Sequence, residues 1–263
     1  MFLVFKRVYA TLRREGVAKT ASKINHSPAH FLEKKRLEKI RALDSIEKKF
    51  TWIYTHNHWK SGESVSGLGS TLEYTENLRK ELPKFLSKFN IKKILDAPCG
   101  DFNWMRYLLP QIDVDYIGAD VVKPLIDSLT AKYSSPHISF MHLDLLKDKL
   151  PKADLMICRD CLFHLSYAET KSALENFLAS NIPYLLTTTH ISVNDFKNKD
   201  ISTGDFRLMN LFKPPYNFPL TPIASIDDWR APDPERQMCL WSRDQVAHAL
   251  LNFGNETNID PTG

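Results

Sequence analysis

From Ile91 onward, short apolar or β-branched runs alternate with stretches that have the spacing of amphipathic helices. Strands that alternate with helices are typical of a parallel sheet whose two faces are covered. The pattern therefore predicts a doubly wound α/β domain. The five runs expected to form parallel strands are Lys93–Asp96, Asp115–Ala119, Ile138–Leu143, Leu155–Cys158 and Tyr184–Thr187.

The alternation ends after Thr189, and residues 191–235 are rich in Pro, Asn and Asp. Two later segments, Pro222–Ile226 and Arg236–Trp241, have the composition of strands and are expected to pair antiparallel. The predicted fold is thus a Rossmann-like, doubly wound, mostly parallel seven-stranded sheet with an antiparallel C-terminal strand. Long insertions at such an edge often carry specificity, so residues 191–235 are expected to form the acceptor side of a pocket.

Apolar residues at helical spacing predict an amphipathic stretch over residues 1–25 and one long helix over residues 29–55. The pair Ser27-Pro28 has the composition of a helix start. Residues 59–71 are mostly small and polar, which is typical of a loop. A further helix is predicted from Thr71 to Lys88.

These elements suggest a division of the chain into a basic helical N-terminal extension, residues 1–58, and one domain, residues 59–263. The net charge of the whole chain is +4, but residues 1–50 alone carry thirteen Lys and Arg against five Asp and Glu. This basic excess indicates either a solvated helical face or peripheral contact with an anionic surface. Because the rest of the chain is net negative, no nucleic acid is expected as a partner.

The four cysteines do not form a disulfide-dense pattern. Cys158 and Cys161 have the CxxC spacing, but no second pair is present to complete a zinc site, so no metal is expected. Reduced thiols and a cytoplasmic location are the expectation. The apolar start, Met1 to Tyr9, is interrupted by charges and is too short to span a bilayer.

Acidic residues close the predicted strands. The loop from Asp96 to Asp101 contains a single glycine, Gly100, and lacks both the GxGxxG pattern and the lysine of a Walker loop. A phosphate site is therefore disfavoured. Its two carboxylates instead suit a cationic ligand such as S-adenosyl-L-methionine, which carries an ammonium and a sulfonium group.

Asp120 and Asp144 end the next two predicted strands, each 24 residues after the preceding acid. Ligands of open α/β sheets bind beyond the carboxyl ends of the strands. There Asp120 can accept hydrogen bonds from ribose hydroxyls, and Asp144 from the adenine amino group, with Leu145 packed on the ring. Each acid alone is equally well explained as a helix cap, but a set of acids in register, with Asp160 as the fourth, favours a ligand site.

The segment Ile94–Met105 resembles the first motif of class I S-adenosylmethionine-dependent methyltransferases, Ile117–Asp120 resembles the second and His142–Asp144 the third. The resemblance covers about residues 55–245. The loop at 59–71 and the run Arg159–Leu165 also resemble a bacterial subgroup found near glycan-assembly genes. One departure is that the usual glycine-rich first loop is reduced to Gly100.

The resemblance implies that Asp96 and Gly100 line the methionyl part of the cofactor, Asp120 the ribose and Asp144 the adenine. The many small polar residues of the loop at 59–71 favour a lid or wall over the cofactor, with Glu63 and Ser66 near its amino acid end; the alternative is a plain connector. Trp104 is expected to pack in the core or against this loop. The full set of expected cofactor residues is Trp59, Ser66, Asp96, Ala97, Pro98, Gly100, Asp101, Asp120, Val121, Asp144, Leu145 and Arg159.

Three residues are candidates for the catalytic role. Asp160 is expected near the reacting methyl group, and His164, four residues later, would share a face with it on a helix. His164 is either a base or a histidine bonded within helix packing. His190, at the end of a strand, is either a base or a solvent-exposed histidine.

Arg207, Trp229 and Arg230 are candidates for holding an anionic or sugar acceptor. The sequence thus predicts S-adenosylmethionine-dependent O- or N-methylation of a small-molecule or glycan acceptor. A protein or nucleic-acid methyltransferase and a non-catalytic binding module with this fold remain alternatives.

Overall fold

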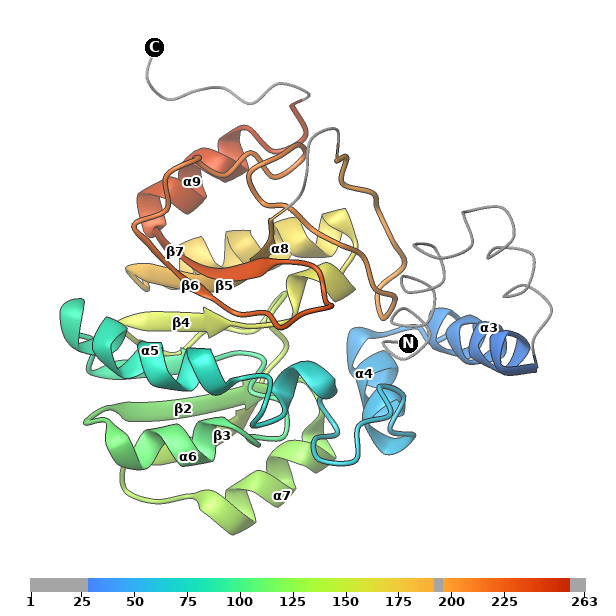
Figure 1. Ribbon diagram of the computed structural model, residues 1–263, viewed down its shortest axis with the longest axis horizontal. Coiled ribbons are helices and arrows are strands. Elements are labelled where there is room, and N and C mark those ends of the chain that lie inside the picture. Colours follow the sequence, from blue (N-terminus) through green and yellow to red (C-terminus); the bar gives the residue numbers. More distant parts are fainter. Residues whose placement is uncertain (1–27, 192–195, 256–263) are drawn as a thin grey trace.

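The computed structural model describes residues 28–191 and 196–255. Its centre is one seven-stranded sheet in the order β3-β2-β1-β4-β5-β7-β6 (Figure 1). Strands β1 to β5 pair in parallel, and β7 is antiparallel to both of its neighbours, β5 and β6. The strands are β1 (Lys93–Asp96), β2 (Asp115–Asp120), β3 (Ile138–His142), β4 (Leu155–Cys158), β5 (Tyr184–His190), β6 (Ala224–Asp227) and β7 (Arg236–Ser242).

The predicted sheet is confirmed, and β5 is the strand whose extent differs most from the prediction. It continues past Thr187 to His190 because β7 pairs with it residue by residue, from Tyr184 opposite Ser242 to His190 opposite Arg236. The β-branched run of threonines before His190 suits this long central pairing.

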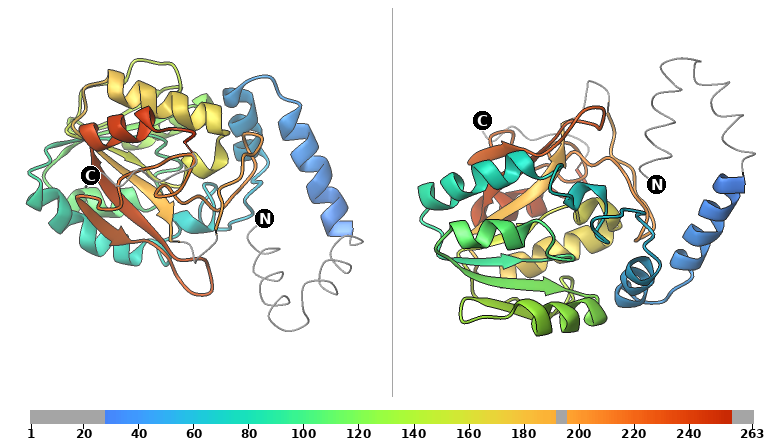
Figure 2. Two further views of the ribbon diagram at one scale, coloured as in Figure 1. Left: turned by 90° about the horizontal axis from the view of Figure 1, so that it is seen from above. Right: turned by 60° about the horizontal axis from the view of Figure 1, so that its bottom comes forward.

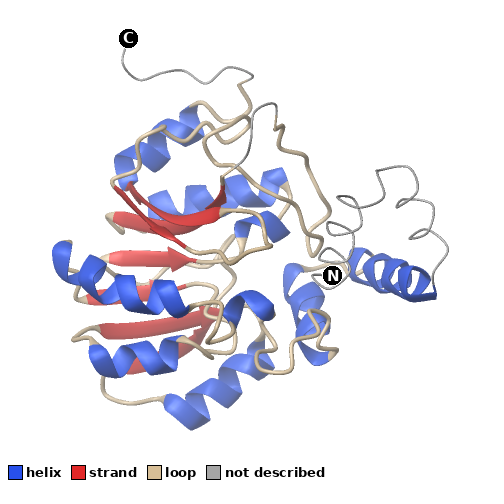
Figure 3. Cartoon of the chain, in the orientation of Figure 1, coloured by secondary structure: helices blue, strands red, loops and turns tan. Residues whose placement is uncertain are grey.

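Helices cover both faces of the sheet (Figures 2 and 3). One face packs against α5 (Glu76–Lys88), α6 (Met105–Leu108) and α7 (Lys123–Tyr133), and the other against α8 (Tyr167–Ala179) and α9 (Arg243–Leu251). Neighbouring residues of β1 illustrate the alternation, since Ile94 belongs to the first core and Leu95 to the second. The two cores fix the sheet and therefore the positions of the loops that leave its carboxyl edge.

The prediction of one helix over residues 29–55 is wrong. The structure has two helices, α3 (Pro28–Arg41) and α4 (Ile46–Thr55). Ser45 separates them, because its backbone is extended and its hydroxyl accepts a hydrogen bond from Lys48 N at 3.2 Å, which caps α4. Helix α5 also starts later than predicted, at Glu76 instead of Thr71. The predicted stretch over residues 1–25, with most of the basic excess, lies outside the described residues.

Helices α3 and α4 lie beyond the carboxyl ends of the parallel strands (Figure 1). Ile40 and Ile53, both fully buried, pack on Gly204, and the Arg41 guanidinium donates to Asp205 Oδ2 at 2.6 Å. The described part of the predicted extension is therefore packed on the domain. Within residues 28–191 and 196–255, no helix has the length and apolar character needed to cross a membrane.

Gly204 tests this packing. Its φ of +96° favours glycine, and a Cβ there would lie 2.6 Å from Ile40 Cγ2. Gly204→Ala should lower the free energy of unfolding by about 1–3 kcal/mol, measured by urea denaturation. Gly62→Ala is the matched control, because a Cβ at Gly62 would meet no atom within 4 Å. Equal stability of the two variants would show that α3 and α4 do not pack on Gly204 in solution.

Candidate active site

A cavity of about 1060 Å³, which includes its opening to solvent, lies at the carboxyl edge of the sheet. The loops after β1, β2, β3 and β4 supply its floor, and α4 and the segment 65–70 supply further walls. Every expected cofactor residue except Asp101 lines it, namely Trp59, Ser66, Asp96, Ala97, Pro98, Gly100, Asp120, Val121, Asp144, Leu145 and Arg159.

Asp101 instead fastens the loop at 59–71 to the loop after β1. Its carboxylate accepts hydrogen bonds from Ser64 Oγ at 3.0 Å and Val65 N at 2.9 Å. Its own amide donates to Ser66 Oγ at 2.8 Å. Ser66 in turn packs on Gly100, whose φ is +55° and where any side chain would collide with the Ser66 hydroxyl. The loop thus forms a fixed wall of the cavity.

Glu63 is expected near the amino acid end of the cofactor, but its carboxylate forms its hydrogen bonds outside the cavity. Its Oε1 accepts hydrogen bonds from Leu72 N and Asn103 Nδ2, both at 2.7 Å, and it does not line the cavity. This residue therefore stabilises the turn that leads from the loop into α5.

Asp96 and Asp120 are buried carboxylates at the floor of the cavity. Asp96 accepts a hydrogen bond from the Tyr116 hydroxyl at 2.7 Å, and burial raises its pKa to about 7. Asp120 accepts from Gly100 N at 3.1 Å and Val122 N at 3.0 Å, and burial raises its pKa to about 6. Burial disfavours the ionised forms of both carboxyl groups. A cation bound beside them would offset this penalty, so the site favours a positively charged ligand.

The wall beside Asp144 is apolar. Asp144 Oδ1 accepts from Leu146 N at 3.0 Å, and Oδ2 pairs with Lys147 Nζ at 3.1 Å. Leu145 and two residues of α4, Ile46 and Phe50, line the cavity and belong to one apolar cluster. Sequence analysis missed the contribution of α4, which also supplies Tyr54. The apolar spacing of this helix was visible, but such spacing is equally compatible with ordinary core packing.

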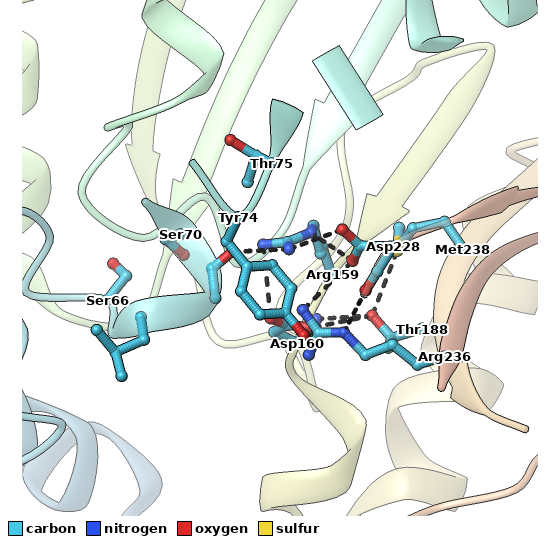
Figure 4. Close-up of polar contacts among 12 residues, drawn as sticks. Ser66, Ser70, Tyr74, Thr75, Arg159, Asp160, Thr188, Asp228, Arg236 and Met238 are labelled. Atoms are coloured by element: carbon cyan, nitrogen blue, oxygen red, sulfur yellow. Dashed lines mark hydrogen bonds and ion pairs between the residues drawn. The ribbon is translucent and has the colours of Figure 1, made fainter. Parts of the chain in front are cut away.

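Asp160 follows β4 and is held by side chains from two other strands. Its amide donates to Thr188 Oγ1 at 2.9 Å, and the Thr188 hydroxyl lies 3.2 Å from Asp160 Oδ1 (Figure 4). Arg236 Nη1 lies 3.0 Å from the same carboxylate oxygen. Burial alone would raise the pKa of Asp160, but Arg159 and Arg236 lower it below its ordinary value.

Asp160 belongs to a buried charge cluster, which we define as Arg159, Asp160, Asp228 and Arg236. Arg159 binds Asp228 through Nε at 2.9 Å and Nη2 at 3.0 Å, and Arg236 Nε donates to the Asp228 carbonyl oxygen at 2.6 Å (Figure 4). Arg159 Nη2 also donates to Gly69 O at 2.8 Å. The cluster therefore joins the loop after β4, the β6–β7 hairpin and the segment that leads into α5.

Sequence analysis found Arg159 and Asp160 but missed Asp228 and Arg236. Asp228 lies 69 residues from Arg159 along the chain, in a segment where Pro and Asp are common. No local sequence pattern identifies Asp228 or Arg236, because the two residues meet only when β6 and β7 pair antiparallel.

The expectation that Asp160 and His164 share a helix face is wrong. Asp160 has a φ of +53°, and His164 ends a short 3₁₀ turn, Leu162–His164. Both residues nevertheless line the cavity. The His164 Nδ1 lies 2.7 Å from Asp205 O, and because a carbonyl only accepts, Nδ1 carries the proton and Nε2 the lone pair. Burial lowers the pKa of His164 to about 4.

His190 does not line the cavity. It is 4% exposed, so the solvent-exposed alternative is also wrong. Its Nδ1 lies 3.2 Å from Met209 N, and its ring packs against Phe163 and Phe206. His190 is buried because β5 extends to this residue and the segment around Met209 packs over the end of the strand.

The three candidates for holding an acceptor do not line the cavity either. Arg207 is buried and donates to the Tyr216 hydroxyl at 2.6 Å, and Arg230 donates to Glu73 O at 2.6 Å. Both side chains fasten the irregular segment to the domain. Trp229, which precedes Arg230 in the sequence, is half-buried. Trp104, in contrast, is 6% exposed and lines the cavity, with the Arg159 guanidinium 5.7 Å from its ring centre.

No protein-family model and no curated protein matches the sequence. Solved structures do match the fold. A Leishmania major S-adenosylmethionine-dependent methyltransferase aligns with a TM-score of 0.56 at 13% identity, over 78% of this chain and 89% of that chain. The fold is that of the class I methyltransferases.

Two further methyltransferases show the same fold. The 1,6-didemethyltoxoflavin-N1-methyltransferase of Burkholderia thailandensis, solved with its substrate and S-adenosylhomocysteine, has a TM-score of 0.53 at 15% identity, over 75% of this chain and 86% of that chain. The N-methyltransferase NodS of Bradyrhizobium japonicum, solved with S-adenosylhomocysteine, has a TM-score of 0.51 at 14% identity, over 72% and 97% of the two chains. The methyltransferase fold thus places the cavity at the usual ligand-binding edge of its sheet.

The buried charge cluster gives a stability prediction. Asp228→Asn removes one charge and leaves two buried guanidinium groups against one carboxylate, so it should cost about 3–5 kcal/mol of unfolding free energy, measured by chemical denaturation. The neighbouring Asp227→Asn is the matched control, because Asp227 is exposed and an asparagine there can still accept from Gln237 Nε2. Similar losses in both variants would contradict the assigned pairing.

Proposed function

We propose that this protein transfers a methyl group from S-adenosyl-L-methionine to a small-molecule acceptor. One observation carries the proposal. In a class I methyltransferase fold, a single cavity is lined by Asp96, Asp120 and Asp144, the acids that close β1, β2 and the strand region after β3. Their order along the sheet edge matches the order of the methionine, ribose and adenine groups in an extended cofactor.

The adenosine half binds at Asp120 and Asp144. Asp120 accepts hydrogen bonds from the ribose hydroxyls, and Asp144 accepts one from the adenine amino group. Leu145 and Phe50 pack on the adenine ring, since both are apolar and line the cavity. Hydrogen-bond acceptors on one edge and apolar surface on the ring faces distinguish adenine from other bases by shape and polarity.

The methionine half binds over the loop after β1. Its ammonium group lies toward Asp96, the carboxylate whose burial makes a cationic partner most favourable. Two hydroxyl groups of the wall, those of Ser66 and Ser70, line the same cavity and supply donors for the methionine carboxylate. Gly100 allows the close approach of Ser66 that closes this end.

The methyl group points toward Asp160 and His164, which both line the cavity. Asp160 Oδ2 lies 3.5 Å from Arg159 Nη1, and His164 keeps Nε2 as an acceptor because its Nδ1–H is bonded to Asp205 O. S-adenosylmethionine supplies an electrophilic methyl on a good leaving group. The protein aligns the acceptor with the carbon–sulfur bond and excludes water, and alignment alone can lower the barrier by several kcal/mol.

Asp120 gives the direct test of the cofactor. Asp120→Ala should weaken the binding of S-adenosylhomocysteine at least about tenfold, because it removes a charged acceptor of two hydroxyl groups. Isothermal titration calorimetry measures this, with Asp115→Ala as the matched control on the same strand, since Asp115 is more than half exposed at the opposite end of β2. Wild-type protein that does not bind at millimolar cofactor would refute the proposed function.

The pH dependence of binding follows from Asp96. Below its raised pKa of about 7 the carboxyl is protonated and neutral, and above it the carboxylate attracts the ligand's ammonium. Affinity for S-adenosylhomocysteine should therefore rise about tenfold from pH 5.5 to pH 8, and Asp96→Asn should remove the part of this rise near pH 7, leaving the part near pH 6 that belongs to Asp120. A variant that keeps the wild-type profile would assign the titration to another group.

A further inference from the structure

We propose that helix α3 docks the protein on an anionic membrane surface, with Phe31 and Leu32 at the interface and neighbouring lysines at the lipid headgroups. This inference concerns an interaction surface and goes beyond the proposed function. The sequence alone leaves open whether the basic N-terminal segment is a solvated face or a contact for an anionic surface. The way in which α3 is held on the domain favours the contact.

Helix α3 is fastened to the domain along one side. The Glu33 carboxylate lies 3.0 Å from Lys60 Nζ, and Ile40 is fully buried. Residues seven positions apart lie on the same side of a helix, so these two define the side that packs on the domain. The opposite side faces away from the domain, and α3 stands out from the rest of the molecule in each view (Figures 1 and 2).

The side of α3 that faces away from the domain, which we call the outer face, combines lysines with large apolar side chains. It consists of Phe31, Leu32, Lys34, Lys35, Glu38 and Lys39, all of them exposed. Phe31 and Leu32 are adjacent and each 57% exposed. Lys35 Nζ lies 4.6 Å from the centre of the Phe31 ring, so apolar surface and positive charge are next to each other.

The outer face is net positive because one of the two acids of α3 is directed elsewhere. Glu33 is only 13% exposed and pairs with Lys60 on the packed side. Glu38 is the single acid on the outer face, against Lys34, Lys35 and Lys39, which leaves a net charge of +2. Lysines at this density attract the negative potential of anionic lipid headgroups.

The domain behind α3 has the opposite charge. Residues 28–60 contain eight Lys and Arg against four Asp and Glu, whereas residues 61–263 contain twenty-one Lys and Arg against twenty-six Asp and Glu. An anionic surface therefore attracts the helical region and repels the domain. This asymmetry orients the molecule with α3 toward the surface.

The apolar residues of the outer face favour a bilayer over a nucleic acid as the partner. Phe31 and Leu32 gain burial when they enter the boundary between headgroups and acyl chains. The phosphate backbone of a nucleic acid has no comparable apolar surface to receive two adjacent side chains of this size.

The arginines of α3 point to the same choice. Arginine is the residue that binds single phosphate groups with two parallel hydrogen bonds. Both arginines of α3 are instead paired with acids of the protein, Arg36 with Glu33 at 3.8 Å and Arg41 with Asp205 at 2.6 Å. The outer face is left with lysines, whose flexible stems suit diffuse attraction to a charged surface.

Docking through α3 also fixes which side of the domain lies near the bilayer. Helices α3 and α4 both lie beyond the carboxyl edge of the parallel strands (Figure 1), and α4 lines the cavity through Ile46, Phe50 and Tyr54. The docked protein therefore holds the cavity on the side of the domain that is closer to the membrane.

Cosedimentation of the full chain with lipid vesicles tests the proposal. Affinity should be at least about tenfold higher for phosphatidylcholine vesicles that contain about 30% phosphatidylglycerol than for phosphatidylcholine alone, and about 0.5 M salt should remove most of this difference. Equal affinity for the two kinds of vesicle would overturn the inference. The measurement needs no S-adenosylhomocysteine, so it fails or succeeds independently of the proposed function.

The apolar part of the outer face is tested by Phe31→Ser/Leu32→Ser. This double variant should lower the affinity for anionic vesicles at least about tenfold, because it removes the side chains that enter the interface. Leu220→Ser/Leu251→Ser is the matched control, since these residues are 57% and 84% exposed and lie outside α3. An equal effect of the two double variants would overturn the inference.

The basic part is tested by Lys34→Gln/Lys35→Gln, which should lower the affinity for anionic vesicles at least about fivefold. Lys123→Gln/Lys132→Gln changes the net charge equally at exposed positions of α7 and should keep the wild-type affinity. Binding that is unchanged in both α3 variants would assign it to another segment and overturn the inference. Tighter binding to a DNA duplex of about 20 base pairs than to anionic vesicles would overturn it in favour of a nucleic acid.

Discussion

The pairing of Arg159 with Asp228 is the interaction on which the candidate active site depends. Both side chains are excluded from water, and removal of either would leave the other as a buried charge without its bidentate partner. Arg236 and Asp160 complete a cluster of two positive and two negative charges that joins β4, the β6–β7 hairpin and the segment before α5. Arg159 and Asp160 both line the cavity, so the cluster places an ionised carboxylate at the proposed methyl end of the site.

The carboxylates of the cavity thus have contrasting environments. Arginines lower the pKa of Asp160, whereas burial raises the pKa of Asp96 and Asp120 because no cation of the protein compensates them fully. A cavity whose acids are not fully neutralised by cations of the protein favours a positively charged ligand. Without that ligand, the burial of these acids lowers the stability of the fold. This distribution of charge agrees with a cofactor that has its ammonium at one end and its reactive cation near Asp160.

Much of the fold was predictable because its signals are local. Apolar runs predicted the strands, and the acids that follow them predicted most of the cavity lining, since parallel strands bring their carboxyl ends to one edge. Contacts between distant segments were not predictable. The break at Ser45, the role of Asp101 in fastening a loop, the burial of His190 and Arg207 and the partnership of Asp228 with Arg159 each depend on which elements meet in space.

A crystal structure of the protein with S-adenosylhomocysteine is the most direct test of the central claim. The account predicts the adenine amino group within hydrogen-bond distance of Asp144, the ribose hydroxyls on Asp120 and the sulfur facing Asp160 and His164. A nucleoside bound in the reverse direction, or outside the cavity, would contradict it.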